Sequence, residues 1–495
     1  GALANSWGLV QNSGCGVCAC GSARSVGRVL RASAAGMAAR RGGLGAAAAV
    51  RPGALVALAL VALALRGGSL PTLPQPGGAV AGGRKILSAG TPGGGGEATY
   101  ALVIDAGSSG SRVHVYKMEW EAGRALPKVT LPDKKLKVKP GLSTFKGKEK
   151  EAGAYLEPLI KFAMEHVPEA QRANTPVVLS GTAGLRMVGE ASAAKILESC
   201  FLWLKANSPF KVERKKISVI SGSDEGALGW LTINYLMGRL DGMPNAAEGT
   251  VGGIELGGAS AQVTFQTADA ADASYPLKVG GKTYQLYTHS YLGFGQEQAR
   301  QKVNEQIGEG TAEDPCMNEG YEKGAGASPM GVYGGHGGVL RGTGSFEKCK
   351  AAAEAIFDKA AACPDAPCSF GGVHQPPMWK GGTSSVILFE NFFHTARNVG
   401  MAPARAEVTP ADFEEAGAKF CGAKWGDVSA HGAGSAYPGM EKEAEYKTCF
   451  SLAYIAAFLQ RGLNMPRGTR VPVMGQVGGS DIEWSLGQGL MAVMN

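Results

Sequence analysis

Residues 103–116 read "VIDAGSSGSRVHVY", and residues 254–265 read "IELGGASAQVTF". In each stretch an aliphatic run ends near an acid, Asp105 or Glu255, and a turn of small residues follows. A second run with alternating apolar residues then begins, and such alternation is typical of strands. Both stretches therefore predict strand, glycine-serine turn, strand, and their similarity indicates a duplicated α/β domain.

Turns of this composition suit phosphate. Glycine lets backbone N–H groups converge on one anion with no Cβ in the way, and serine hydroxyls add donors. The candidate phosphate-binding residues are Gly107, Ser108, Ser109, Gly110, Gly257, Gly258, Ala259 and Ser260. An acid beside such a turn would repel phosphate unless a cation lay between them. Asp105 and Glu255 therefore predict a hydrated Ca²⁺ or Mg²⁺, bound through water.

A candidate general base lies in "KISVISGSDEGALGWLTINYLMG", residues 216–238. The pattern predicts a strand and then a helix that begins near Ser223 and ends at Gly238. A carboxylate in the first turn of a helix stays ionised at neutral pH. Glu225 is therefore our candidate base for activating a water molecule.

Three further residues complete the candidate catalytic set. Thr182, in "SGTAGLR", would donate to a terminal phosphoryl group. Gln262 would orient the attacking water, and Arg112 would offset negative charge that develops in the transition state. Each residue type is also common in ordinary turns and caps, so the prediction rests on their occurrence together.

The first 96 residues form a separate compositional segment. They contain nine Lys or Arg and no Asp or Glu, so taking +9 from the net charge of +7 leaves about −2 for the rest. That balance argues against nucleic acid as a partner. The apolar run 54–65 is shorter than the roughly 20 residues that span a bilayer. We expect a targeting leader with a signal-peptide core or short signal-anchor at 54–65, then a Gly-rich linker, and membrane attachment through this segment.

Cysteine usage supports entry into the secretory pathway, to the Golgi lumen, the cell surface or the exterior. An organelle transit peptide is the alternative for the leader. Seven cysteines follow the leader, and six of them crowd the C-terminal part. This favours three disulfides, with Cys200 left as a buried thiol, but spacing alone leaves the pairing open.

Other motifs of nucleotide and hydrolytic enzymes are missing from the sequence. Residues 141–148, "GLSTFKGK", have one residue too many between their glycines for a P-loop, and Glu149 stands where Ser or Thr is required. The chain has no H-E-x-x-H, no zinc spacing and no G-x-S-x-G elbow.

Five motifs in order resemble those of the apyrase, or nucleoside triphosphate diphosphohydrolase, family. They are "DAGSSGSRVHVY" from Asp105, "SGTAGLR" from Ser180, "SGSDEGALGWLTINYLMG" from Ser221, "ELGGASAQVTF" from Glu255 and "EWSLGQGL" from Glu483. The resemblance runs from about residue 99 to the end. It implies an actin-like, ribonuclease-H-like duplicated fold of two lobes with the active site in the cleft between them. We expect residues 97–221 plus 476–495 to form lobe I and residues 222–475 to form lobe II.

The resemblance also implies a reaction and its residues. Nucleoside tri- and diphosphates would be hydrolysed to the monophosphate with Ca²⁺ or Mg²⁺. The family's metal-binding acids map to Asp105 and Glu255, its base to Glu225, and its groups near the attacked phosphorus to Thr182 and Gln262. The implied disulfides are Cys316–Cys349, Cys363–Cys368 and Cys421–Cys449.

The chain departs from the family's pattern at two acids. Glu255 stands where the family usually has Asp, and Glu483 stands where it has a small residue before Trp484. The first loop is more similar to those of plant and endomembrane members. Phe392 and Phe393 are candidates for stacking on the nucleobase, although core packing is the commoner role for such a pair.

Two other functions fit part of the pattern. An exopolyphosphatase or guanosine-pentaphosphate phosphatase would share the paired acidic loops but not the helix after Ser221 or the cysteine pairs. A lectin-like nucleotide-binding receptor would have no need of Glu225. An ATP-driven kinase or chaperone would lack the leader and the disulfides.

Overall fold

The structure is a computed structural model that describes residues 98–307, 313–323, 340–380, 383–384, 386–430 and 435–494. All of them belong to one compact unit, Gly83–Asn495. The predicted leader, including the apolar run 54–65, lies outside the described residues. Within the described ranges, no helix combines the length and the apolar character that crossing a bilayer requires.

The first sheet has the strand order β3-β2-β1-β5-β6, and β4 also pairs with β2. Its strands are β1 (Thr99–Ala106), β2 (Ser111–Glu119), β3 (Lys128–Val129), β4 (Lys134–Val138), β5 (Pro176–Gly181) and β6 (Lys211–Val219). β1 runs antiparallel to β2 and parallel to β5. Because β1 and β5 are central and covered on both faces, they are near-continuous apolar runs.

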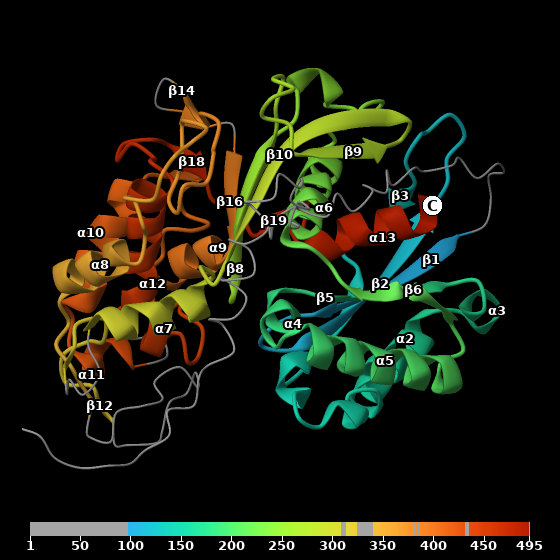
Figure 1. Cartoon of the computed structure of the whole chain (residues 1–495), viewed down its shortest axis with the longest axis horizontal. Helices are drawn as coiled ribbons and strands as arrows, with labels where there is room; N and C mark the ends of the chain where they lie inside the picture. The colour runs from blue at the N-terminus through green and yellow to red at the C-terminus, as the bar shows by residue number, and fades with distance from the viewer. Residues whose placement is uncertain are drawn as a thin grey trace, which may run out of the picture. The chain divides into compact units, whose positions relative to one another are not determined.

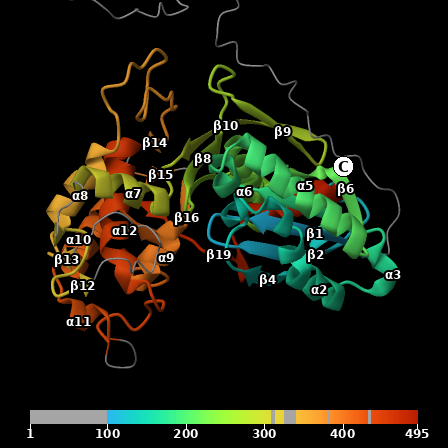
Figure 2. The same cartoon turned by 60° about the horizontal axis from the view of Figure 1, so that its bottom comes forward.

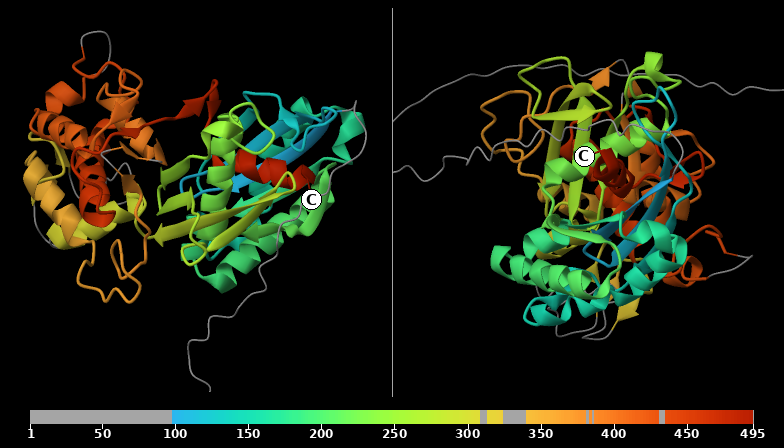
Figure 3. Two further views of the ribbon diagram at one scale, coloured as in Figure 1. Left: turned by 90° about the horizontal axis from the view of Figure 1, so that it is seen from above. Right: turned by 90° about the vertical axis from the view of Figure 1, so that its right-hand side faces the viewer.

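Helices cover both faces of this sheet. One face packs against α2 (Glu157–His166) and α5 (Glu190–Asn207), which share a buried cluster with the strands. The other face packs against the C-terminal helix α13 (Trp484–Met494), which lies along the blue strands in Figure 3. Residues 484–494 thus cover one face of the sheet that begins with β1.

The second sheet has the order β16-β7-β8-β10-β9. Its strands are β7 (Gly252–Leu256), β8 (Ser260–Gln266), β9 (Tyr275–Val279), β10 (Lys282–Leu292) and β16 (Val386–Glu390). One face packs against α6 (Gly222–Leu236). The other face meets a helical layer that Figure 2 shows gathered on one side, formed by α7 (Gln296–Ile307), α8 (Phe346–Ala355), α9 (Asn391–Asn398), α10 (Pro410–Cys421) and α12 (Glu445–Ala457).

Shorter elements connect these layers. The helices among them are α3 (Glu169–Arg172), α4 (Ala183–Met187), α11 (Trp425–Val428), the 3₁₀ turns η1 (Leu142–Phe145), η2 (Glu149–Glu151), η3 (Ala154–Leu156) and η4 (Ala246–Glu248), and the π-turn η5 (Phe458–Gly462). The strands are β11 (Glu313–Asp314), β12 (Glu322–Lys323), β13 (Leu340–Gly342), β14 (Trp379–Lys380), β15 (Thr383–Ser384), β17 (Glu407–Val408), β18 (Val471–Pro472), β19 (Gln476–Val477) and β20 (Ser480–Asp481).

The two sheets repeat one arrangement. In the first, β1 pairs antiparallel with β2 and parallel with β5; in the second, β7 pairs antiparallel with β8 and parallel with β16. The predicted duplication and the predicted two-lobe α/β architecture are therefore confirmed (Figure 1).

Helices α6 and α13 pack together between the sheets. The contact is close because Gly487 has no side chain: a Cβ there would lie 2.4 Å from the carbonyl oxygen of Leu228. Thr232 Oγ1 reinforces it by donating to the carbonyl of Glu483 and accepting from Gly487 N–H, at 2.9 Å each. The helix pair fixes the start of α13 against the middle of α6.

Helix α6 begins at Gly222, one residue before the predicted Ser223. Ser221 caps it in a box with Asp224, and each of the two residues satisfies a backbone N–H of the other. The helix ends at Leu236, and Gly238 adopts a left-handed φ of 68° just beyond. The first-turn position predicted for Glu225 is confirmed.

The three disulfides implied by the family resemblance are present. All lie in the part of the chain that carries the helical layer of the second sheet. Cys200 is a free, buried thiol on α5, as expected. The pairing that spacing left open is thus resolved.

Candidate active site

A cavity of about 390 Å³ is lined by both glycine turns. Of the predicted site residues, those in its wall are Asp105, Gly107, Ser108, Ser109, Gly110, Arg112, Thr182, Glu225, Glu255, Gly257, Gly258, Ala259 and Ser260. Gln262 is not in the wall, but its amide lies 2.6 Å from Ser260 Oγ and 3.3 Å from Glu225 Oε2. The structure thus brings the whole predicted set together.

The first turn, between β1 and β2, packs closely against β4 on one side and against Gly184 of α4 on the other. A Cβ on Gly110 would lie 2.7 Å from the carbonyl oxygen of Val138, and one on Gly184 would lie 2.9 Å from the Cα of Ser108. Thr182, the residue before α4, is tied to this turn because its N–H donates to the carbonyl of Ala106 at 3.3 Å. The backbone of the turn is therefore held from two sides.

The second turn, between β7 and β8, faces the first. A Cβ on Gly258 would lie 2.9 Å from Ser108 Oγ, so the two turns approach closely at this point. The turn is closed by a hydrogen bond from Gly257 N–H to the carbonyl of Ser260 at 3.0 Å. Two amide-rich turns from different sheets thus border one hollow, which is the geometry that an extended phosphate chain requires.

Three acids stand at strand ends around this hollow: Asp105, Glu255 and Glu390. Burial raises the pKa of Asp105 to about 6 and that of Glu390 to about 7. Burial and then the charges of Glu225 and Glu390 hold the pKa of Glu255 well above its usual range. Ionising all three without a counter-charge is therefore costly.

A hydrated divalent cation fits this donor set. Asp105 Oδ1 and Glu255 Oε2 are buried and have no hydrogen-bond partner. Across the described residues, however, no three His, Cys, Asp or Glu side chains stand close enough to bind one ion directly. Oxygen ligands that act through water suit Mg²⁺ or Ca²⁺ better than any metal that needs nitrogen or sulfur.

Glu225 lies in the cavity wall and is held there by Arg186, a residue the sequence analysis did not single out. Arg186 Nη2 lies 2.7 Å from Glu225 Oε2. Burial raises the pKa of Glu225 to about 7, although the adjacent guanidinium opposes this rise. The prediction that its position in the first helical turn keeps this carboxylate ionised at neutral pH is therefore wrong. Arg186 stands in the "SGTAGLR" motif, but nothing in the sequence pairs it with an acid 39 positions away.

A second part of the wall was also missed. It carries Lys137, Glu297, Glu390, Asn391, His394, Glu441 and Lys447. Burial lowers the pKa of His394 to about 4, so its ring is neutral at physiological pH. Phe392 is fully buried in the core and Phe393 packs against that core, and neither lines the cavity. The stacking role considered for this pair is not supported, and the neighbouring His394 lies in the wall instead.

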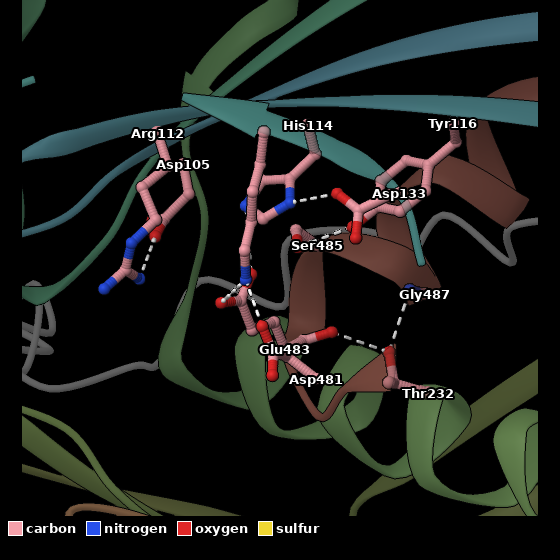
Figure 4. Close-up of polar contacts among 11 residues, drawn as sticks. Asp105, Arg112, His114, Tyr116, Asp133, Thr232, Asp481, Glu483, Ser485 and Gly487 are labelled. Carbon is pink, nitrogen blue, oxygen red and sulfur yellow. Dashed lines mark hydrogen bonds and ion pairs between the residues drawn. The ribbon is translucent and has the colours of Figure 1, made fainter. Parts of the chain in front are cut away.

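Glu483, the acid next to Trp484, is held in a charged network (Figure 4). His114 lies between two carboxylates, with Nδ1 2.8 Å from Asp133 Oδ2 and Nε2 3.0 Å from Glu483 Oε2. Lys135 adds a contact of 3.1 Å to Glu483. Burial opposes ionisation of Glu483, but the neighbouring His114, Lys135 and Arg112 side chains bring its pKa below the usual value. The departure from the family's small residue is thus compensated locally.

A family model described as the GDA1/CD39 (nucleoside phosphatase) family matches residues 95–495. The chain belongs to this family. It is therefore a nucleoside phosphatase, an enzyme that hydrolyses phosphoric anhydride bonds, and the resemblance drawn from its five motifs is confirmed.

Individual relatives agree with this assignment. A guanosine-diphosphatase of Schizosaccharomyces pombe is 33% identical over 419 residues, which cover 79% of this chain and 73% of the relative. An ectonucleoside triphosphate diphosphohydrolase 1 of Rattus norvegicus is 32% identical over 429 residues, covering 78% and 80%.

A solved structure is similar in fold. It is titled as that of nucleoside triphosphate hydrolases from Neospora caninum, and it superposes with a TM-score of 0.56 at 16% identity, covering 80% of this chain and 92% of that one. At this identity the likeness concerns the fold alone, and it agrees with the actin-like, two-lobed architecture predicted for the GDA1/CD39 chain.

Proposed function

We propose that this chain hydrolyses nucleoside tri- and diphosphates to the nucleoside monophosphate and inorganic phosphate, using water activated by Glu225 and a Ca²⁺ or Mg²⁺ ion. The observation that carries the proposal is the approach of the two turns across one cavity, with Ser108 next to Gly258 and a buried carboxylate, Glu225, in the same wall. Phosphate binding and a general base are thereby combined in one site.

The substrate's phosphate chain would lie between the two turns. Backbone N–H groups of residues 107–110 and 257–260 would hold its oxygens, and Ser108 and Ser260 would add hydroxyl donors. Asp105 and Glu255 would hold the cation through its water ligands, and a bound cation would neutralise phosphate charge and orient the terminal group. Their unpaired buried oxygens support this role.

Glu225 would take one proton from the attacking water. The water oxygen forms a bond to the terminal phosphorus, and the bridging P–O bond breaks, so its electrons leave with the shortened nucleotide. Gln262, 3.3 Å from Glu225 Oε2, would orient the water, and Thr182 would donate to the phosphoryl oxygens. Arg112, 3.7 Å from Asp105, would offset charge on the leaving phosphate.

The lobe boundaries and the compartment belong to the same proposal. Residues 97–221 with 476–495 would form one lobe and residues 222–475 the other. Three disulfides fit an oxidising compartment. A preference for GDP or UDP would favour the Golgi lumen, and a preference for ATP would favour the cell surface or the exterior.

Phosphate release tests the proposal. ATP, ADP, GDP, UDP and inorganic polyphosphate are compared with Mg²⁺, with Ca²⁺ and with EDTA. We expect metal-dependent release from nucleotides, and a loss of about 10²–10⁴-fold in kcat for Glu225→Gln with nucleotide binding retained. Hydrolysis of polyphosphate in preference to nucleotides would favour the polyphosphatase alternative. Binding without turnover would favour a receptor, and an active Glu225→Gln variant would overturn the mechanism.

A further inference from the structure

Arg186 connects the proposed base to the second phosphate turn. Its Nη2 lies 2.7 Å from Glu225 Oε2 and 3.2 Å from Ser260 Oγ. The arginine belongs to α4, which follows a strand of the first sheet, whereas Glu225 and Ser260 belong to α6 and β8 on the second sheet. The contact therefore joins elements of both sheets within the site.

The two donors near Glu225 approach the same oxygen. Arg186 Nη2 and Gln262 Nε2 both point at Oε2, at 2.7 Å and 3.3 Å. Among the contacts of the described residues, Oε1 receives no hydrogen bond from either. One carboxylate oxygen is thus fixed, and the other remains available to accept a proton.

The surroundings leave space for a guanidinium in this position. A Cβ on Gly222, the first residue of α6, would lie 2.6 Å from Arg186 Nη1 and 2.2 Å from Ser290 Oγ. A glycine at this point therefore lets the planar group lie against the start of the helix. The side chain is only 14% exposed, and that of Glu225 is 8% exposed, so solvent screens their attraction weakly.

We propose that Arg186 is a positioning residue for Glu225: it fixes Oε2 so that Oε1 faces the attacking water. The inference rests on the proposed role of Glu225. Both contacts come from one nitrogen, Nη2, and arginine suits this task better than lysine because the planar guanidinium fixes the directions of its N–H groups, whereas an ammonium rotates freely. The contact to Ser260 further fixes the base relative to the phosphate turn, and hence to the phosphorus.

Steady-state kinetics of Arg186→Ala and Arg186→Lys test this role with the nucleotide that the wild-type protein hydrolyses best. A misplaced base lowers turnover more than affinity, so we expect kcat of the alanine variant to fall about 100-fold and its KM to change little. Added guanidinium at non-denaturing concentration restores part of kcat. Lysine keeps the positive charge but not the fixed donor directions, so the kcat of Arg186→Lys lies between those of the wild type and of Arg186→Ala.

The matched control is Arg214→Ala. Arg214 lies on β6 and pairs with Glu198 at 3.0 Å, outside the cavity. Its variant keeps wild-type kcat, and guanidinium does not raise its activity. Thermal unfolding of each variant verifies folding, and if Arg186→Ala does not fold, Arg186→Lys and its kcat-to-KM pattern decide.

The outcomes separate this inference from the proposed function. Retained hydrolysis in Glu225→Gln overturns the base itself, whatever the arginine variants do. With Glu225→Gln inactive, the positioning role is wrong if folded Arg186→Ala keeps its kcat, if only KM rises, or if guanidinium restores nothing. A rise in KM alone would mean that Arg186 binds phosphate instead.

Discussion

Asp105 and Glu255 occupy equivalent places in the two sheets but face unequal partners. Across the first strand pair Asp105 faces Arg112, and across the second Glu255 faces Gln262. Arg112 gives Asp105 a counter-charge at 3.7 Å, whereas the neutral amide of Gln262 gives Glu255 none. The duplicated strands thus deliver two acids to one cavity in different electrostatic states.

Glu255 should therefore depend on the cation more strongly. We predict that Glu255→Gln raises the Mg²⁺ concentration needed for half-maximal activity at least tenfold, as loss of a group that orients metal ligands typically does. Glu255→Asp keeps the charge and should retain metal dependence close to wild type. Thermal unfolding with increasing Mg²⁺ and no nucleotide measures the same difference without turnover. If Mg²⁺ raised the unfolding temperature of Glu255→Gln as much as that of the wild type, the assignment of Glu255 as a cation-holding residue would be wrong.

The buried acids also predict how stability varies with pH. The pKa values of Asp105 and Glu390 rise on folding to about 6 and about 7, so the folded state holds these protons more tightly. Their contribution is fully present below the unfolded values near 4 and is lost as pH rises through 6 to 7. With EDTA, the unfolding temperature should fall between pH 5 and pH 8, and Mg²⁺ should reduce the fall. In Glu390→Gln the unfolding temperature should fall less steeply over this pH range. A rise in the unfolding temperature of the wild type from pH 5 to pH 8 would refute the prediction.

The contact between α6 and α13 predicts a strong effect of one methyl group. In Gly487→Ala the new Cβ would meet the carbonyl oxygen of Leu228 at 2.4 Å, and backbone cannot move aside cheaply. We expect a loss of about 1–3 kcal/mol in the free energy of unfolding. Gly426→Ala is the control, because a Cβ there meets nothing within 4 Å. Urea denaturation measures both variants, and equal free energies of unfolding for Gly487→Ala and Gly426→Ala would contradict this prediction.

The disulfides should contribute unequally to the free energy of unfolding. Cys316–Cys349 closes 33 positions and Cys363–Cys368 only 5. On the loop-entropy model, removing the longer crosslink by paired serine substitution costs about 4 kcal/mol and removing the shorter about 2 kcal/mol. Urea unfolding of both double variants measures this, and a larger loss from the short loop would contradict the model.

Much of the site followed from local patterns in the sequence. The acids, turns and first-turn carboxylate sit where strand alternation and helix signals predict them, because such patterns depend on near neighbours. The equivalence of residues 104–107 with 254–257 then placed two turns in one cleft. The cysteine pairs followed only from the family resemblance.

The rest depends on contacts between distant segments. Arg186 meets Glu225 only because α4 and α6 converge, and His394 enters the wall because β16 ends beside β7. The compensation of Glu483 by His114 likewise joins β2 to the start of α13. No local pattern encodes such pairings, and for this reason the sequence revealed the phosphate turns but not the arginine behind the base.

The position of α13 bears on how the protein is made. Trp484 and Ser485 form part of the cavity wall, and the helix they begin covers the sheet that starts at Thr99. During translation, the cavity wall therefore stays incomplete until residues 484–494 emerge from the ribosome. Hydrolysis therefore requires that synthesis has passed α13, because a shorter nascent chain lacks part of the cavity wall.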